Sequence, residues 1–105
     1  MKVITQGHKY ELSNFEQDLP EINQTLQFIH KEPTVIGKPE LTTVSDGTTN
    51  EEVLRVLIDR MQFLQAKFPC RENAIVITNL EESLMWLEKR TADRKARGVE
   101  GKQIK

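Results

Sequence analysis

Apolar residues recur at helical spacing along the second half of the chain. Between residues 46 and 68 they step by 3, 4, 3 and 4 positions, which is typical of a helix packing along another helix. This stripe consists of Leu54, Leu57, Met61, Leu64 and Phe68. Residues 71–97 carry a matching stripe, made of Ile77, Leu80, Leu84 and Leu87. Because only Pro69 and Cys70 separate the two segments, the pattern predicts an antiparallel helical hairpin.

The first 45 residues follow a different pattern. Residues 2–5 and 9–12 alternate in polarity around Gly7, which is typical of a small hairpin. Residues 24–31 and 41–44 are further strand candidates, and residues 14–23 are predicted to form a loop. The sequence therefore predicts an α+β fold, with a small N-terminal antiparallel β-sheet followed by a long antiparallel α-helical hairpin. We expect a single domain over residues 1–105, with a β-rich portion at 1–45, the hairpin at 46–97 and a tail at 98–105.

Capping residues indicate where the helices start. Thr49 followed three positions later by Glu52 forms a capping-box pattern, which predicts the start of the first helix. The second helix is predicted to begin at about Arg71. An arginine in a first turn is unfavourable for the helix itself, because the helix dipole places partial positive charge there. A role in binding an anion would explain it better.

The predicted hairpin has more apolar surface than two helices can cover. The apolar residues that lie off the two stripes are Val53, Val56, Phe63, Ile75, Val76, Met85 and Trp86. The small sheet can cover some of this surface, and we expect a second copy of the chain to cover the rest. The sequence therefore predicts a homo-oligomer.

Composition excludes several classes of protein. The longest apolar run, residues 74–77, is too short to span a membrane, and residues 1–10 lack the apolar core of a signal peptide. A single cysteine, Cys70, excludes an internal disulfide framework and fits a reducing compartment. We therefore expect a cytoplasmic protein that makes no membrane contact.

The net charge of −1 hides an asymmetry between the two ends of the chain. Residues 89–105 contain seven Lys or Arg and two carboxylates, a balance of +5, so residues 1–88 carry −6. A basic end can attract an anionic ligand or an acidic surface of another subunit, or it can be a solvated helix end. Nucleic-acid binding through residues 89–105 is an alternative, but the acidic remainder of the chain counts against it.

The residue types needed for catalysis are not grouped. His8 and His30 lie in separate segments, and neither has metal-ligand spacing with Cys70. The carboxylate pairs at 51–52 and 81–82 are adjacent in sequence, so their side chains diverge on a helix. There is also no glycine-rich phosphate loop. We therefore predict a protein that is not an enzyme and that uses no metal or other cofactor.

Anion binding is better supported, and four residues are candidates for it. Arg71 lies where free backbone N–H groups already favour a phosphate, and Asn73 offers both a donor and an acceptor. Phe63 could stack on a purine or form an oligomer contact, and Asn73 could simply cap the turn. Arg90 supplies a further charge, unless it only pairs with a neighbouring glutamate.

The spacing of these candidates limits how they can act together. Asn73 and Arg90 are 17 residues apart on the predicted helix, which is about 25 Å at 1.5 Å per residue. One nucleotide cannot touch both residues of a single chain. If both bind the same molecule, they must come from two subunits packed antiparallel, and the site is then shared across a dimer interface.

The run FPCREN-AIVITNLEESLMWLEKR resembles the C-terminal hairpin of phage nucleotide "sponges" of the anti-CBASS and Thoeris anti-defence type. The β-rich start is most similar to the Thoeris anti-defence branch, and the resemblance covers residues 46–97. It implies a protein that sequesters cyclic nucleotide immune signals without cleaving them, so that the Thoeris or CBASS effector stays inactive. The ligands implied are cyclic ADP-ribose isomers and, in hexameric members, cyclic di- or trinucleotides.

The resemblance also implies roles for particular residues. Phe63, Asn73 and Arg90 match positions of the pocket for ADP-ribose isomers, and Arg71 matches an arginine that meets cyclic trinucleotides. Cys70 departs from the family pattern, in which a serine often stands. The partners implied are a cyclic nucleotide ligand and further copies of the chain, as a homodimer or as a hexamer built from three dimers. A small nucleic-acid-binding or structural adaptor protein of a phage remains the alternative.

Overall fold

The structure is a computed structural model that describes residues 1–17 and 19–105. Its internal contacts divide the chain into two compact units, residues 1–49 and residues 50–105. The first unit contains all the strands and the second contains both helices, which confirms the predicted α+β fold class. Asp18, within the predicted loop at 14–23, lies outside the described residues. Whether the two units act as the predicted single domain stays a prediction.

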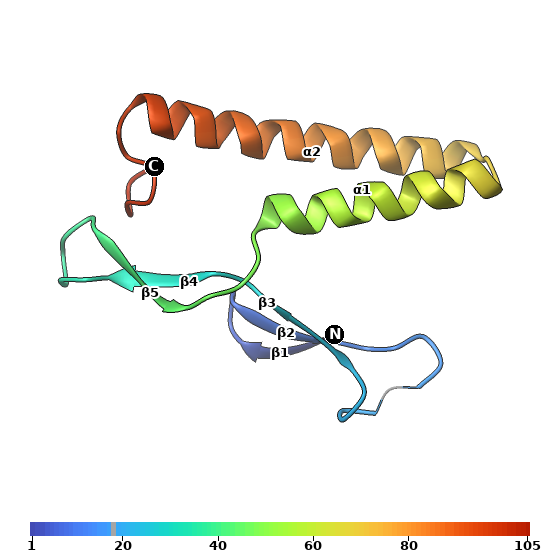
Figure 1. Ribbon diagram of the computed structural model, residues 1–105, viewed down its shortest axis with the longest axis horizontal. Coiled ribbons are helices and arrows are strands. Elements are labelled where there is room, and N and C mark those ends of the chain that lie inside the picture. The colour runs from blue at the N-terminus through green and yellow to red at the C-terminus, as the bar shows by residue number, and fades with distance from the viewer. Residues whose placement is uncertain (18) are drawn as a thin grey trace. The chain divides into compact units, whose positions relative to one another are not determined.

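The first unit contains a three-stranded antiparallel sheet and a two-stranded one, rather than a single sheet (Figure 1). The strands of the larger sheet are β1 (Lys2–Thr5), β2 (Lys9–Leu12) and β3 (Gln24–Gln27), and they lie side by side in that order. The predicted hairpin around Gly7 is confirmed. Gly7 has a φ of 77°, a left-handed conformation that glycine adopts without steric cost.

The smaller sheet pairs β4 (His30–Pro33) with β5 (Leu41–Ser45). The single strand expected at residues 24–31 was wrong, because the chain changes hydrogen-bonding partners at residues 28 and 29. The Phe28 N–H donates to the His8 carbonyl at 2.7 Å, but the Ile29 N–H donates to the Thr48 carbonyl at 2.9 Å. The residues predicted to form one strand therefore belong to two sheets, with Gln24–Gln27 in β3 and His30 and Lys31 in β4.

Aromatic rings pack within this first unit. Tyr10 and Phe28 meet edge to face with ring centroids 6.0 Å apart, a favourable geometry for aromatic pairs. The imidazoles of His8 and His30 stack in parallel at 3.6 Å. Among the described residues, no apolar side chain is fully buried in either unit.

The second unit is a helical hairpin of α1 (Asn50–Lys67) and α2 (Arg71–Ala96), which run antiparallel beside each other (Figure 1). The helix starts agree with the predictions, since α1 begins directly after Thr49 and α2 begins at Arg71. The predicted stripe on α2 is confirmed, as all four of its apolar residues are half-buried.

The predicted stripe on α1 was partly wrong. Leu57 is 44% exposed and Phe68, beyond the end of the helix, is 80% exposed. Ile58 and Gln65 are half-buried instead. Leu57 and Ile58 are neighbours, so both fit a helical period that starts at Leu54, and only packing against α2 decides between them.

The end of α2 folds back on itself. The Gly98 N–H donates to the Lys95 carbonyl and the Val99 N–H donates to the Arg94 carbonyl, at 3.1 and 3.0 Å. With Gly98 at a φ of 71°, this is a Schellman motif, a common way to end a helix. The predicted tail at 98–105 is therefore a folded segment, which curls back beneath the end of α2 (Figure 1). In the described part of the chain, no helix is long and apolar enough to cross a membrane.

Candidate ligand-binding site on the helical hairpin

The turn between the helices is held by a glutamine side chain. The Gln65 carboxamide oxygen accepts from the Cys70 N–H at 3.0 Å, and its NH2 group donates to the Cys70 carbonyl at 3.1 Å. Both backbone groups of Cys70 are thereby satisfied by one side chain of α1. This pair fixes the position of Cys70 just before α2, and with it the direction in which α2 starts.

Cys70 caps α2 through its sulfur. Its Sγ accepts a hydrogen bond from the Asn73 backbone N–H at 3.4 Å, and its extended backbone, with φ −150° and ψ 161°, is that of an N-cap residue. The thiol thus takes the part that a serine hydroxyl plays in many helices. The Cys70 side chain therefore supplies the cap that the sequence analysis considered for Asn73.

Arg71 and Asn73 differ in their exposure. The Arg71 side chain is exposed at the first position of α2, whereas Asn73 is half-buried on the stripe that faces α1. The Cys70 cap occupies the Asn73 N–H only. The other N–H groups of the first turn have no partner within the helix, so this end keeps the partial positive charge that attracts anions.

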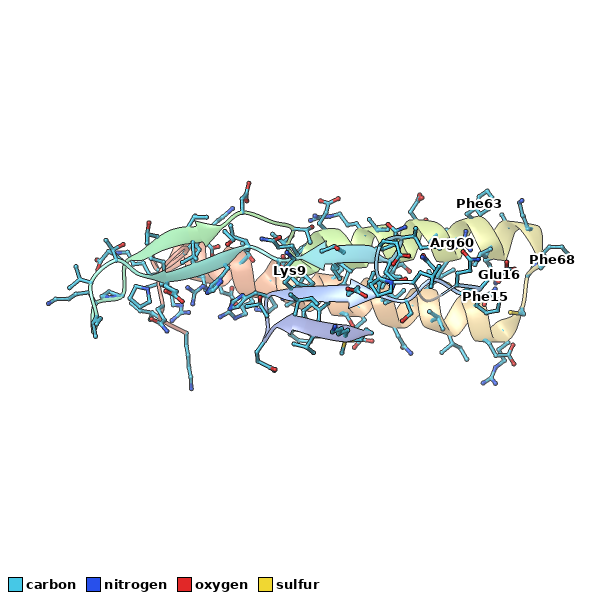
Figure 2. The ribbon with its side chains drawn as sticks, turned by 90° about the horizontal axis from the view of Figure 1, so that it is seen from below. Lys9, Phe15, Glu16, Arg60, Phe63 and Phe68 are labelled. Atoms are coloured by element: carbon cyan, nitrogen blue, oxygen red, sulfur yellow. The ribbon has the colours of Figure 1, made fainter. Side chains whose placement is uncertain are left out.

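Phe63 projects from α1 near the same turn (Figure 2). Its ring is 53% exposed, as expected for a position off the packing stripe. Lys67 Nζ lies 4.6 Å from the ring centroid, within the range of a cation–π contact. One face of the ring therefore has a positive charge over it, which would favour an anionic ligand nearby.

Arg90 lies further along α2, in a hollow of about 240 Å³. The hollow is lined by Trp86, Lys89, Arg90, Asp93 and Arg97. Three of these residues are cationic and one is acidic, and Lys89 Nζ pairs with Asp93 at 3.1 Å. Within the described residues Arg90 takes part in none of the ion pairs, so the expected alternative of a pair with a neighbouring glutamate is not realised.

A larger hollow, of about 450 Å³, lies on the hairpin between α1 and α2. Three carboxylates line it, from Asp59, Glu81 and Glu88, against the single guanidinium of Arg55. Arg55 also pairs with Glu88 at 3.3 Å, and this links the two helices. Because the balance of charge is negative, this hollow would repel an anion, and we place the candidate site elsewhere.

The four predicted site residues fall into two groups. Phe63, Arg71 and Asn73 lie at the turn end of the hairpin, and Arg90 lies near the other end of α2. Asn73 and Arg90 are 17 positions apart on one continuous helix, so the spacing of about 25 Å expected from the sequence holds within one chain. Within one chain, the two groups of predicted residues are therefore too far apart for one nucleotide to touch both.

Sequence reasoning missed the residues that line the hollow together with Arg90. Trp86 was considered only as leftover apolar surface, and Arg97 only as part of a basic end. Their signal was present in the sequence, since 86, 90, 93 and 97 follow one face of a helix at steps of 4, 3 and 4. Among the described residues, no group of His, Cys, Asp or Glu is arranged to hold a metal ion.

The fold defines a class of protein: a helical-hairpin domain with basic residues gathered near the far end of its second helix. Residues 24–92, about two thirds of the chain, match the family described as "Acb2/Tad1, hairpin domain". The chain belongs to this family. It is also similar to a protein of Bacillus phage SBSphiJ7 called "Thoeris anti-defense 1", with 55% identity over 58 residues. Those residues make up 54% of this chain but only 41% of the relative, so the chain spans less than half of that protein's length.

Proposed function

We propose that the chain is a phage counter-defence protein that binds a cyclic nucleotide immune signal and holds it uncleaved in the host cytoplasm. The ligand class that we infer is a cyclic ADP-ribose isomer, with cyclic di- and trinucleotides as further candidates. The observation that carries the proposal is the 55% identity to the Thoeris anti-defence protein, together with membership of the hairpin family.

The chemistry of the hairpin supports this ligand class. A cyclic ADP-ribose isomer contains a pyrophosphate and a purine. The exposed guanidinium of Arg71 and the cationic hollow at Arg90 suit the phosphates, because arginine matches phosphate oxygens in both charge and geometry. The exposed ring of Phe63 suits the purine.

The separation of the two groups of predicted residues supports a shared site between subunits. If two copies pack antiparallel, the turn of one lies near the Arg90 hollow of the other, and a twofold axis then produces two equivalent sites. We infer a homodimer as the smallest binding unit, and a hexamer of three dimers is compatible with the same arrangement. To deplete a signal, such a site needs nanomolar affinity, or about −12 kcal/mol.

The test is thermal unfolding and calorimetry with a panel of cyclic ADP-ribose isomers, cyclic dinucleotides and cyclic trinucleotides. At a free ligand concentration of 100 times Kd, we expect the bound protein to gain about 2.7 kcal/mol of stability. Asn73→Ala and Arg90→Ala should each remove this gain. Lys95→Ala is the matched control, because it deletes another exposed cation of α2.

Two results would contradict the proposal. One is that no ligand of the panel stabilises the protein. The other is that both site variants bind as well as the unchanged chain, which would leave the hairpin as a purely structural element.

Storage without cleavage is tested separately. We expect ligand released by heating the complex to be chemically identical to the ligand supplied, as judged by chromatography and mass spectrometry. This expectation is compatible with the described residues, among which no group of His, Cys, Asp or Glu is arranged to hold a metal ion. A hydrolysed product that accumulates with time would show that the protein is an enzyme.

A further inference from the structure

A further hollow, of about 200 Å³, lies in the first unit and is lined by residues of both its sheets. All six side chains that line it are polar, and none of them is a carboxylate. They belong to Thr5, His8, Lys9, Gln27, His30 and Ser45. We call this the histidine hollow.

Strand pairing brings five of these residues together. Thr5 pairs with Lys9 and Lys9 pairs with Gln27, so these three form one row across β1, β2 and β3. His30 pairs with Ser45 across β4 and β5. Because directly paired residues of antiparallel strands project from the same face of a sheet, each row presents its side chains on one side.

The sixth residue, His8, joins the two rows. Its ring stacks on that of His30 with an interplanar angle of 8° and centroids 3.6 Å apart. Its carbonyl accepts from the Phe28 N–H, just before the chain passes from the first sheet to the second. The histidine stack therefore connects the sheets at the hollow.

Four of the lining side chains have hydrogen-bonding capacity to spare. Within residues 1–17 and 19–105, the side chains of Thr5, His8, Lys9 and Ser45 take part in no hydrogen bond or ion pair. Hydroxyl, imidazole and ammonium groups can all donate. The hollow therefore collects four donors that the described residues leave without an acceptor.

Lys9 makes the hollow electropositive. Lysine side chains are mostly exposed in proteins, but Lys9 is half-buried. Glu32 contacts His30 Nε2 at 3.2 Å but does not line the hollow, so no carboxylate of the lining balances the ammonium. A partly buried charge is stabilised by an opposite one, and an anion could supply it here.

A metal ion fits this arrangement poorly. Parallel imidazoles hold their lone pairs in parallel planes, so the two rings cannot both aim at one ion, and the ammonium would repel it. No metal-binding group of His, Cys, Asp or Glu is found among the described residues. A tetrahedral oxyanion suits better, because its several oxygens can accept from donors on different sides.

We propose that the histidine hollow binds a phosphate group through the Lys9 ammonium, a His8 N–H and the two hydroxyls. Water takes up about 30 Å³ per molecule in the liquid, so a hollow of about 200 Å³ has room for the five heavy atoms of phosphate. The phosphate can be the free ion or part of a nucleotide. None of the candidate residues of the hairpin lines this hollow, so the inference goes beyond the proposed function and does not rest on it.

The test is an NMR titration of the full chain with inorganic phosphate and, separately, with adenosine monophosphate. We expect saturable shifts of the Thr5, Lys9 and Ser45 amide signals, which chloride at equal ionic strength does not produce. Tighter binding of the nucleotide would identify the phosphate of a larger ligand as the occupant. Equal or tighter binding of inorganic phosphate would identify the free ion.

Two variants remove donors from the hollow. Lys9→Gln should weaken phosphate binding about tenfold to a hundredfold, as expected for loss of a hydrogen bond to a charged group. His8→Phe keeps a ring on His30 but removes the N–H, and should weaken binding about two- to tenfold. Lys2→Gln is the matched control, because it removes an exposed cation of β1 that does not line the hollow. Thermal unfolding checks that each variant folds, and if one does not, the other decides.

Arg90→Ala separates this site from the hairpin and should leave the shifts in the first unit unaltered. Shifts that do not saturate, or a loss in Lys2→Gln as large as that in Lys9→Gln, would overturn the phosphate site. Loss of the same shifts in Arg90→Ala would overturn it as well. Failure of all cyclic nucleotides to bind, with phosphate still bound in the histidine hollow, would count against the proposed function alone.

Discussion

Single side chains determine the geometry of the hairpin turn. Gln65 satisfies both backbone groups of Cys70, and the Cys70 sulfur then caps the first turn of α2. Three hydrogen bonds thus place Arg71 and Asn73 at the start of the helix. Because thiols are weak acceptors, the cap is the contact most open to improvement.

Replacing the thiol by a hydroxyl should therefore stabilise the hairpin. We expect Cys70→Ser to raise the free energy of unfolding by a few tenths of a kcal/mol to about 1 kcal/mol, because serine is among the strongest N-cap residues. Cys70→Ala, which has no acceptor, should lower it by a similar amount. Urea unfolding of the unchanged chain and the two variants measures their order of stability. An alanine variant as stable as the serine variant would show that the sulfur contact contributes nothing.

The two hydrogen bonds between the Gln65 side chain and the Cys70 backbone provide a second test. Gln65→Ala removes two hydrogen bonds that are largely exposed to water, so we expect a loss of about 1 kcal/mol in the free energy of unfolding. Gln62→Ala is the control, since this exposed glutamine lies one turn earlier on α1. Thermal unfolding of both variants should show a lower Tm for the first only. Equal Tm values would mean that the turn is fixed by Pro69 and the helix packing.

At the scale of the elements, the junction between the two sheets of the first unit depends on close backbone approach. A Cβ atom on Gly47 would lie 2.5 Å from the Gln27 carbonyl oxygen and 2.6 Å from the Phe28 carbonyl carbon. Glycine is therefore needed here for space. At Gly37, in contrast, an added Cβ would meet nothing within 4 Å, and only its φ of 82° disfavours other residues.

The two glycines should respond differently to alanine. Gly47→Ala forces the new Cβ against backbone atoms of Gln27 and Phe28, and we expect it to cost about 2–3 kcal/mol, near the upper end for overpacking. Gly37→Ala should cost only about 1 kcal/mol, the penalty of a left-handed conformation. Circular dichroism during urea unfolding compares them, and the close packing at residues 27, 28 and 47 would be refuted if both lost the same stability.

At the scale of the whole molecule, much apolar surface is left uncovered. On the hairpin, the large apolar residues that are exposed are Val56, Leu57, Phe63, Phe68, Ile75, Val76, Met85 and Trp86. Soluble monomers rarely expose so many neighbouring apolar side chains. This supports the homo-oligomer expected from the sequence, which remains a proposal.

The predicted oligomerisation can be tested by placing one negative charge on the exposed apolar surface of α2. We expect the unchanged chain to sediment as a dimer or larger, with a Tm that rises with protein concentration. Trp86→Glu should shift it towards the monomer, because Trp86 is a large aromatic residue, 56% exposed, on the outer face of α2. Ile36→Glu places the same charge on an exposed apolar residue of the β4–β5 hairpin and should leave the assembly unchanged. If the chain is monomeric at every concentration, the proposal of a binding site shared between two subunits is also contradicted.

The sequence by itself determined the hairpin, the limits of its helices and the distance between Asn73 and Arg90, because helical period and rise depend only on local backbone geometry. It also contained the match to the anti-defence family. Tertiary structure decided which of Leu57 and Ile58 turns inward, where the run at 24–31 changes sheets, and how His8 and His30 come to stack. Each of these depends on contacts between residues that local patterns treat as equivalent, so only the folded chain could choose among them.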